Sequence, residues 1–177
     1  MNAPTIHTQR FTIRAFKESD AELWQVWDMD TEIQMYMPEP SNEPKSITEQ
    51  YKYIKECEKE EDGLYWSIES KDGITIGTVA LTEINEYHKL AELGIVIGDK
   101  NVWGKGVATE VIGAIVEYAF SVLGIISISA ETESENIAIS KVLEKVGFIQ
   151  DGHFFSARVK NNQRVDVKHY GIVRPQK

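Results

Sequence analysis

Patterns of apolar and β-branched residues predict seven β-strands along the chain. In residues 11–16, FTIRAF, apolar and polar residues alternate, which is typical of a strand with one buried face. The next three segments are separated by turn residues and short polar links, and this spacing predicts an antiparallel meander. The predicted strands cover residues 11–16, 64–70, 74–84, 91–97, 125–131, 148–159 and 165–173, the last two forming a hairpin.

Between these segments, apolar residues recur with the period of an α-helix. Asp20 is predicted to cap a helix that runs from Ala21 to about Met29. Ser46 is predicted to cap a second helix, which covers residues 47–60. Two further helices are predicted from Ala108 to about residue 124 and across residues 137–146. The order of elements indicates an α+β fold with a mixed, mostly antiparallel central sheet of about seven strands, in one domain over residues 1–177.

Composition and charge exclude several classes of function. The formal net charge is -9, whereas nucleic-acid binding through phosphate contacts needs clustered Lys and Arg. No apolar run reaches the roughly 18 to 20 residues of a membrane span, and the first ten residues lack the apolar region of a leader peptide. Cys57 is the only cysteine and the histidines show no ligand spacing, so no metal site is expected. These features predict a cytoplasmic protein without nucleic-acid or membrane partners.

The segment WGKGVATEV, residues 103–111, indicates an anion site. It joins a predicted strand to a predicted helix, and a helix N-terminus offers free N–H groups and a positive dipole end. Gly104 and Gly106 let the backbone approach a phosphate closely, and Lys105 adds a positive charge. The segment is not a Walker A loop, and Thr109 stands where a dinucleotide fingerprint has its third glycine. A glycine-rich turn without any ligand remains the alternative.

A second strand-to-helix unit follows in ENIAISKVLEKVGF, residues 135–148. Asn136 lies at the start of the helix, and Ser140 lies one turn later on the same face. Two neighbouring strands therefore each lead into a helix. If these strands splay apart, a ligand can lie between them.

Taken together, these motifs resemble the GNAT superfamily of acetyl-CoA-dependent N-acetyltransferases. Within it, the chain looks like the branch that contains the ribosomal-protein N-terminal and the spermidine acetyltransferases. The resemblance extends from TQRFTIRAF through AELGIVIGDKNVWGKGVATEV and ENIAISKVLEKVGF to NNQRVDVKHY. It implies a GNAT fold with two splayed central strands that hold CoA, and direct acetyl transfer to a primary amine in a ternary complex. The acceptor is left open between a protein N-terminus, a polyamine and a small amine.

The resemblance also implies which residues hold acetyl-CoA. The family's pyrophosphate loop falls on Asn101, Gly104 and Gly106, and Asn101 departs from the usual Gln or Arg. The strand edge near residue 96 would hold the pantetheine arm as an added strand, with Asn136 on the other side. The implied co-substrate residues are Ile95, Val96, Ile97, Trp103, Gly104, Lys105, Gly106, Val107, Ala108, Thr109, Asn136 and Ser140.

Catalysis requires a base for the ammonium and an acid for the leaving sulfur. Many family members have a Tyr acid at the position of Leu143, whereas Ser140 matches a Ser assigned this role in the ribosomal-protein branch. A serine that bonds its own helix backbone is the alternative. Glu83 and Glu92 are the candidate bases, against the alternative of solvent-exposed strand ends. The implied acceptor residues are Tyr36, Glu39, Glu83 and Glu92.

Two rival functions remain open. A catalytically silent acyl-CoA-binding sensor would bind CoA without turnover, and a flavin or nucleotide binder would use the same glycine loop without affinity for CoA. The acidic candidates favour a cationic acceptor, while Ser140 and Leu143 favour the ribosomal-protein branch. The acceptor is therefore predicted only as an amine, and a homodimer is left open.

Overall fold

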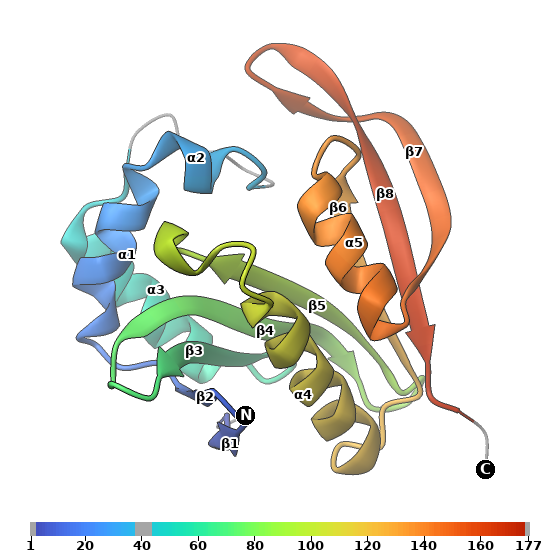
Figure 1. The fold of residues 1–177 in the computed structure, drawn as a ribbon, viewed down its shortest axis with the longest axis horizontal. Coiled ribbons are helices and arrows are strands. Elements are labelled where there is room, and N and C mark those ends of the chain that lie inside the picture. The colour runs from blue at the N-terminus through green and yellow to red at the C-terminus, as the bar shows by residue number, and fades with distance from the viewer. Residues whose placement is uncertain (1–2, 38–43, 176–177) are drawn as a thin grey trace.

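The computed structural model describes residues 3–37 and 44–175, whose strands form one continuous sheet (Figure 1). The strand order is β1-β2-β3-β4-β5-β6-β8-β7. All neighbouring strands are antiparallel except β5 and β6, so the predicted mixed, mostly antiparallel α+β sheet is confirmed. The strands are β1 (Ile6–His7), β2 (Phe11–Ala15), β3 (Leu64–Ser70), β4 (Thr75–Asn85), β5 (Leu90–Ile97), β6 (Ser127–Glu133), β7 (Ile149–Lys160) and β8 (Gln163–Val173).

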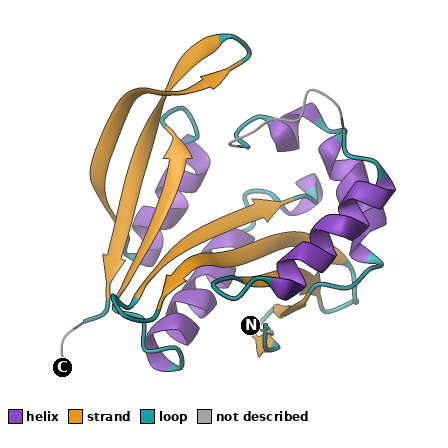
Figure 2. Ribbon diagram, turned by 180° about the vertical axis from the view of Figure 1, so that it is seen from behind, coloured by secondary structure: helices purple, strands orange, loops and turns teal. Residues whose placement is uncertain are grey.

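This sheet has one strand more than the seven expected, because β1 has two residues and is too short to show a period. The helices of the described ranges are α1 (Asp20–Asp28), α2 (Thr31–Gln34), α3 (Ile47–Lys59), α4 (Val107–Ser121) and α5 (Ile137–Val146), with one 3₁₀ turn, η1 (Lys100–Val102). Figures 1 and 2 show α4 and α5 on one face of the sheet and α1 and α3 on the other. Each face has a hydrophobic core, centred on Ile112 and Ile115 of α4 and on Trp24 and Ile54 of α1 and α3.

Local capping chemistry sets most helix ends. The Ser46 hydroxyl accepts the N–H of Glu49, and the Glu49 carboxylate accepts the N–H of Ser46, which forms a capping box. Asn136 caps α5, and Gly147 ends it with φ of 111°, a left-handed conformation that favours glycine. Asp20 is different, because it is the first residue of α1 and its side chain caps nothing.

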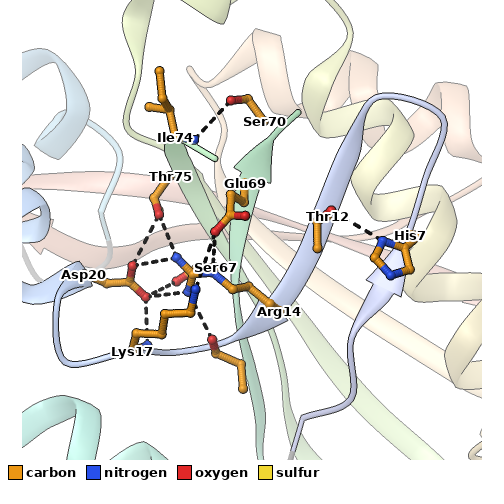
Figure 3. Close-up of polar contacts among 11 residues, drawn as sticks. His7, Thr12, Arg14, Lys17, Asp20, Ser67, Glu69, Ser70, Ile74 and Thr75 are labelled. Atoms are coloured by element: carbon orange, nitrogen blue, oxygen red, sulfur yellow. Dashed lines mark hydrogen bonds and ion pairs between the residues drawn. The ribbon is translucent and has the colours of Figure 1, made fainter. Parts of the chain in front are cut away.

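The predicted role of Asp20 as a cap is therefore wrong, and its carboxylate instead joins a buried polar cluster (Figure 3). The Arg14 guanidinium donates to both Asp20 oxygens at 2.9 Å, and to Glu69 at 2.6 Å. The Ser67 hydroxyl donates to Asp20 at 2.7 Å. Because Ser67 and Glu69 belong to β3, this cluster ties α1 to β2 and β3.

Strands β5 and β6 pair in parallel over three residues only, Leu90 to Glu92 against residues 127–129. Beyond this segment β5 continues to pair with β4, and β6 continues to pair with β8. The two strands therefore separate towards the ends that lead into the glycine loop and α5 (Figure 1). The predicted splay of two central strands is confirmed.

Candidate active site

The glycine loop, which is the segment WGKGVATEV at residues 103–111, lies at the open end of the splay, where β5 leads through η1 into α4. Gly106 is the residue before α4 and has φ of 76°, and Gly104 has φ of 71°. Both values lie in the left-handed region, which explains why glycines stand at these positions. The first turn of α4, from Val107 to Thr109, directs its unpaired N–H groups out of the helix end. This geometry suits an anion such as a phosphate.

Some groups of the predicted loop are already engaged within it. The backbone N–H of Trp103 donates to Lys100, and that of Lys105 donates to Val102, both at 3.2 Å. The indole N–H of Trp103 donates to the Ile97 carbonyl at 2.8 Å. The backbone N–H groups of Trp103 and Lys105 are therefore not open to an anion, whereas those of the first turn of α4 are.

A cavity of about 380 Å³ occupies the space between the splayed strands and the helices α1, α2, α3 and α5. Aromatic rings from α1, α3 and β3 line one part of it, with Phe16 and Trp24 in edge contact at a centroid distance of 4.5 Å. The opposite part is formed by β5, β6 and α5. Its charged lining residues are Asp28, Lys45, Glu92, Glu131 and Arg158. Carboxylates thus outnumber cations along its wall.

Glu92 lines this cavity and also a second hollow of about 320 Å³, so it lies where the two spaces meet. It is the last residue of β5 that pairs with β6. Burial raises the pKa of Glu92, and the negative charges of Glu131 and Glu83 raise it further. Arg158 and His169 act in the opposite direction. A half-buried carboxylate with a raised pKa beside a cavity has the properties of a general base.

The family profile described as the acetyltransferase (GNAT) domain matches residues 10–149. The chain belongs to the GNAT acetyltransferase family.

Named relatives agree with this assignment. The uncharacterized N-acetyltransferase YoaA of Bacillus subtilis is 29% identical over 174 residues, which cover 97% of this chain and 98% of the relative. The spermidine N(1)-acetyltransferase of Vibrio cholerae is 34% identical over 98 residues, 55% of this chain and 56% of the relative. A crystal structure of the Vibrio cholerae spermidine N-acetyltransferase in complex with CoA and spermine superposes with a TM-score of 0.85 and 26% identity, covering 94% and 96% of the two chains.

In this GNAT chain, the predicted residues of α5 have partners of their own. The Asn136 side chain accepts the N–H of Ile139 at 3.4 Å, as an N-cap does, while the residue also lines the cavity. The Ser140 side chain is buried, and its hydroxyl donates to the Asn136 carbonyl at 3.1 Å. Leu143, one turn further along α5, lines the cavity. The self-bonded serine considered as an alternative is thus present.

The predicted acceptor residues lie apart from one another. Tyr36 lines the cavity, and its hydroxyl donates to the Glu135 carbonyl at 3.4 Å, so it connects the α2 side to the α5 side. Glu83 is exposed on β4, at a bulge where its φ is 51°, and it lines the second hollow only. Glu39 lies outside the described residues.

Two charged contacts were missed by the sequence analysis. Arg158 enters the cavity wall and donates to Glu131 at 2.6 Å. Arg10 donates to Glu110 and to the Lys105 carbonyl beside the glycine loop. Because each contact joins segments distant in sequence, no local period or motif could have found it.

The part of the chain that the structure describes, residues 3–37 and 44–175, contains no group of three His, Cys, Asp or Glu residues placed to hold a metal ion. In the same ranges, no helix combines the length and apolar character needed to cross a membrane.

Proposed function

We propose that the chain transfers the acetyl group of acetyl-CoA directly to a primary amine. The observation that carries this proposal is the meeting of two features at the β5–β6 splay. One is the left-handed Gly106 that opens the N-terminus of α4, and the other is the cavity with Glu92 in its wall. A phosphate-bearing donor fits the first feature and an amine acceptor fits the second.

In this proposal, the pyrophosphate of acetyl-CoA lies against the N–H groups of the first turn of α4. The pantetheine arm follows the part of β5 between Leu93 and Ile97, where β6 no longer pairs with it. An arm rich in amides binds such an edge as an added strand does. The thioester then reaches the end of the splay, near Glu92.

Glu92 is the proposed general base. An amine enters as an ammonium ion and must lose a proton before it attacks the thioester carbonyl. The raised pKa of Glu92 strengthens it as a proton acceptor and brings it closer to neutral pH, where a base is most effective. The neighbouring hollow, lined by Glu83, Asp62 and Ser129, offers the proton a route to solvent.

Ser140 is proposed as the donor to the departing sulfur. Its hydroxyl already has a hydrogen, which it donates to the Asn136 carbonyl in the structure. To assist the reaction, this hydroxyl must exchange the carbonyl for the developing thiolate, which as a charged acceptor forms the stronger bond. Leu143 lines the cavity nearby but has no proton to give.

The acceptor is proposed to be a cationic amine with an apolar body. The wall carboxylates Asp28, Glu92 and Glu131 favour a positive charge, and the rings of Trp24 and Tyr53 favour apolar or cationic groups. The spermidine acetyltransferase relatives are consistent with such an acceptor. A protein N-terminus and a small amine satisfy the same chemistry, so the class is left at a primary amine.

The first test is release of free thiol from acetyl-CoA with spermidine, N-terminal peptides, aminoglycosides and amino sugars as acceptors. Thiol release with one class supports the enzyme and names the acceptor. No release with any class, although CoA binds in calorimetry, would favour the silent acyl-CoA sensor, for which the self-bonded Ser140 is the supporting observation. Absence of CoA binding would contradict both.

The donor site is tested with Gly106→Glu, which places a negative charge at the helix N-terminus. We expect CoA affinity to fall at least about a hundredfold. Gly73→Glu is the matched control, because Gly73 has φ of 77°, close to the 76° of Gly106, and open space around it, so both variants carry the same backbone strain. Equal CoA affinity of the two variants would refute the donor site.

Ser140→Ala tests the proposed donor to sulfur. We expect kcat to fall about tenfold with an unchanged KM for acetyl-CoA, because the bond matters only as the thiolate forms. Ser121→Ala is a control, since the Ser121 hydroxyl makes the same type of bond to the Glu117 carbonyl in α4. A kcat equal to that of the control would remove Ser140 from the mechanism.

A further inference from the structure

The turn between β1 and β2 contacts the glycine loop and the first turn of α4, mainly through Arg10. The backbone N–H of Arg10 donates to one carboxylate oxygen of Glu110 at 2.8 Å, and its Nε donates to the other at 2.6 Å. Its Nη1 donates to the carbonyl oxygen of Lys105 at 2.9 Å. Arg10 therefore binds both the loop and the first turn of α4, from a position about 100 residues earlier in the chain.

Glu110 is a negative charge in the first turn of the helix whose N-terminus is proposed to receive phosphates. Burial alone would raise the pKa of Glu110, but hydrogen bonds from Thr8 and Arg10 lower it, so the side chain is ionised at neutral pH. An unpaired carboxylate at this place would repel an anionic ligand. The Arg10 guanidinium, 2.6 Å away, neutralises it.

Arg10 also acts on the backbone of the loop. Its bond to the Lys105 carbonyl engages an oxygen that lies next to Gly106 in the chain and would otherwise be free to face a phosphate. The Nη2 atom lies 3.6 Å from the point where a Cβ of Gly106 would stand. Among the described residues, no partner accepts from this Nη2, which leaves one charged donor beside the left-handed glycine.

We infer that Arg10 is a positioning residue for the phosphates of CoA. It holds the glycine loop through Lys105, cancels the charge of Glu110 and leaves its Nη2 as a donor beside Gly106 at the N-terminus of α4. The inference rests on the proposed function, because it needs the loop to receive the pyrophosphate. It assigns to the β1–β2 turn a part in donor binding, while the acceptor cavity is built by other elements.

The test compares ligands that contain or lack the phosphates. Calorimetric titrations with CoA and with pantetheine are made on the wild type and on Arg10→Ala, with pantetheine used up to millimolar concentration. We expect Arg10→Ala to raise the Kd for CoA about fivefold to tenfold and to leave the Kd for pantetheine within twofold. If Arg10 only stabilised the fold, Arg10→Ala would weaken the binding of CoA and of pantetheine to the same extent.

Two further variants distinguish the effect of the Glu110 charge on CoA binding from a nonspecific effect of removing a surface cation. In Arg10→Ala/Glu110→Gln the repelling carboxylate is also absent, so we expect about half of the lost free energy of CoA binding to return. Lys55→Ala is the matched control, because Lys55 is likewise an exposed cation in an ion pair, 2.8 Å from Glu18 on the α1–α3 side. It should bind CoA as the wild type does.

The outcomes are distinct. Loss of CoA affinity in Arg10→Ala with unchanged pantetheine affinity supports the inference. Equal loss for both ligands, or CoA affinity equal to that of Lys55→Ala, overturns it while leaving the proposed function intact. Failure of the wild type to bind CoA at all would instead contradict the proposed function.

Discussion

Asp20 and Glu92 are both carboxylates removed from solvent, and their surroundings are opposite. Asp20 is 3% exposed and accepts hydrogen bonds from Arg14, Ser67 and the Lys17 backbone. Although burial alone would raise the pKa of Asp20, these bonds hold it below its usual value. The Glu92 side chain has no hydrogen bond or ion pair within the described residues. Burial and the negative charges of Glu131 and Glu83 raise its pKa, while Arg158 and His169 lower it.

This difference separates a structural charge from a chemical one. A satisfied carboxylate stabilises the charged form and is of little use as a proton acceptor, because its proton affinity is low. A carboxylate left without partners beside a cavity keeps a high proton affinity and has room for a ligand. The unsatisfied group is therefore the better candidate for chemistry, even though Arg14 and Asp20 belong to the extensive cluster of polar contacts drawn in Figure 3.

The largest expected effect follows from Glu92→Gln. Loss of the general base should lower kcat about a hundredfold to ten-thousandfold, since this is the usual contribution of such a group. Glu83→Gln, at an exposed position, should lower it by less than about threefold. Steady-state rates of thiol release distinguish them. A Glu92→Gln variant with normal turnover would contradict the distinction between Glu92 as a catalytic carboxylate and Asp20 as a structural one.

Asp20→Asn should act on stability instead. Removing one partner of a buried ion pair leaves Arg14 with Glu69 as its remaining carboxylate partner, so we expect the free energy of unfolding to fall by about 3 kcal/mol, the lower end of the usual range. Urea unfolding followed by circular dichroism measures it. A loss below about 1 kcal/mol would show that the cluster tolerates a neutral partner and contributes little.

The contribution of the Arg14–Asp20 ion pair to the free energy of unfolding should depend on pH. Because the folded pKa of Asp20 is lowered, its contribution is complete above the unfolded pKa of about 3.9 and is lost as the pH falls through the lower folded value. The gap in unfolding free energy between the wild type and Asp20→Asn should therefore narrow below about pH 4. A constant gap would contradict the ionic origin of the effect.

The smallest effects are expected from the neighbours of Glu92. Arg158→Gln removes a positive charge that lowers the pKa of Glu92, so the acidic limb of kcat/KM should move to higher pH. Glu131→Gln removes a negative charge that raises this pKa, so the acidic limb should move to lower pH. If the acidic limbs of the Arg158→Gln and Glu131→Gln variants moved in the same direction, Glu92 would be excluded as the titrating group.

The comparison also explains which parts of the site could be predicted. Glu92 was proposed from its place at a strand end, but its raised pKa depends first on burial in the assembled fold and then on Glu131, which reaches it from another strand. Asp20 was predicted as a helix cap because it precedes an amphipathic segment, and Arg14 draws its carboxylate elsewhere. Ser140 was predicted to lie one turn after Asn136 on the same face of its helix, and its bond to the Asn136 carbonyl follows from this local helix geometry.

The sequence by itself determined the features that depend on a few consecutive residues. Periods of two and 3.6 specified the strands and helices, and Ser46, Gly106, Asn136 and Gly147 specified where helices begin or end. Only the tertiary structure decided how far β5 and β6 pair, and which charges meet in the cavity. Arg158 reaches Glu131 because β6, β8 and β7 are adjacent and β7 changes register between Phe154 and Arg158. Such contacts depend on the pairing of distant segments. Burial and long-range electrostatics together set the pKa of Glu92, and both exist only after that pairing has formed.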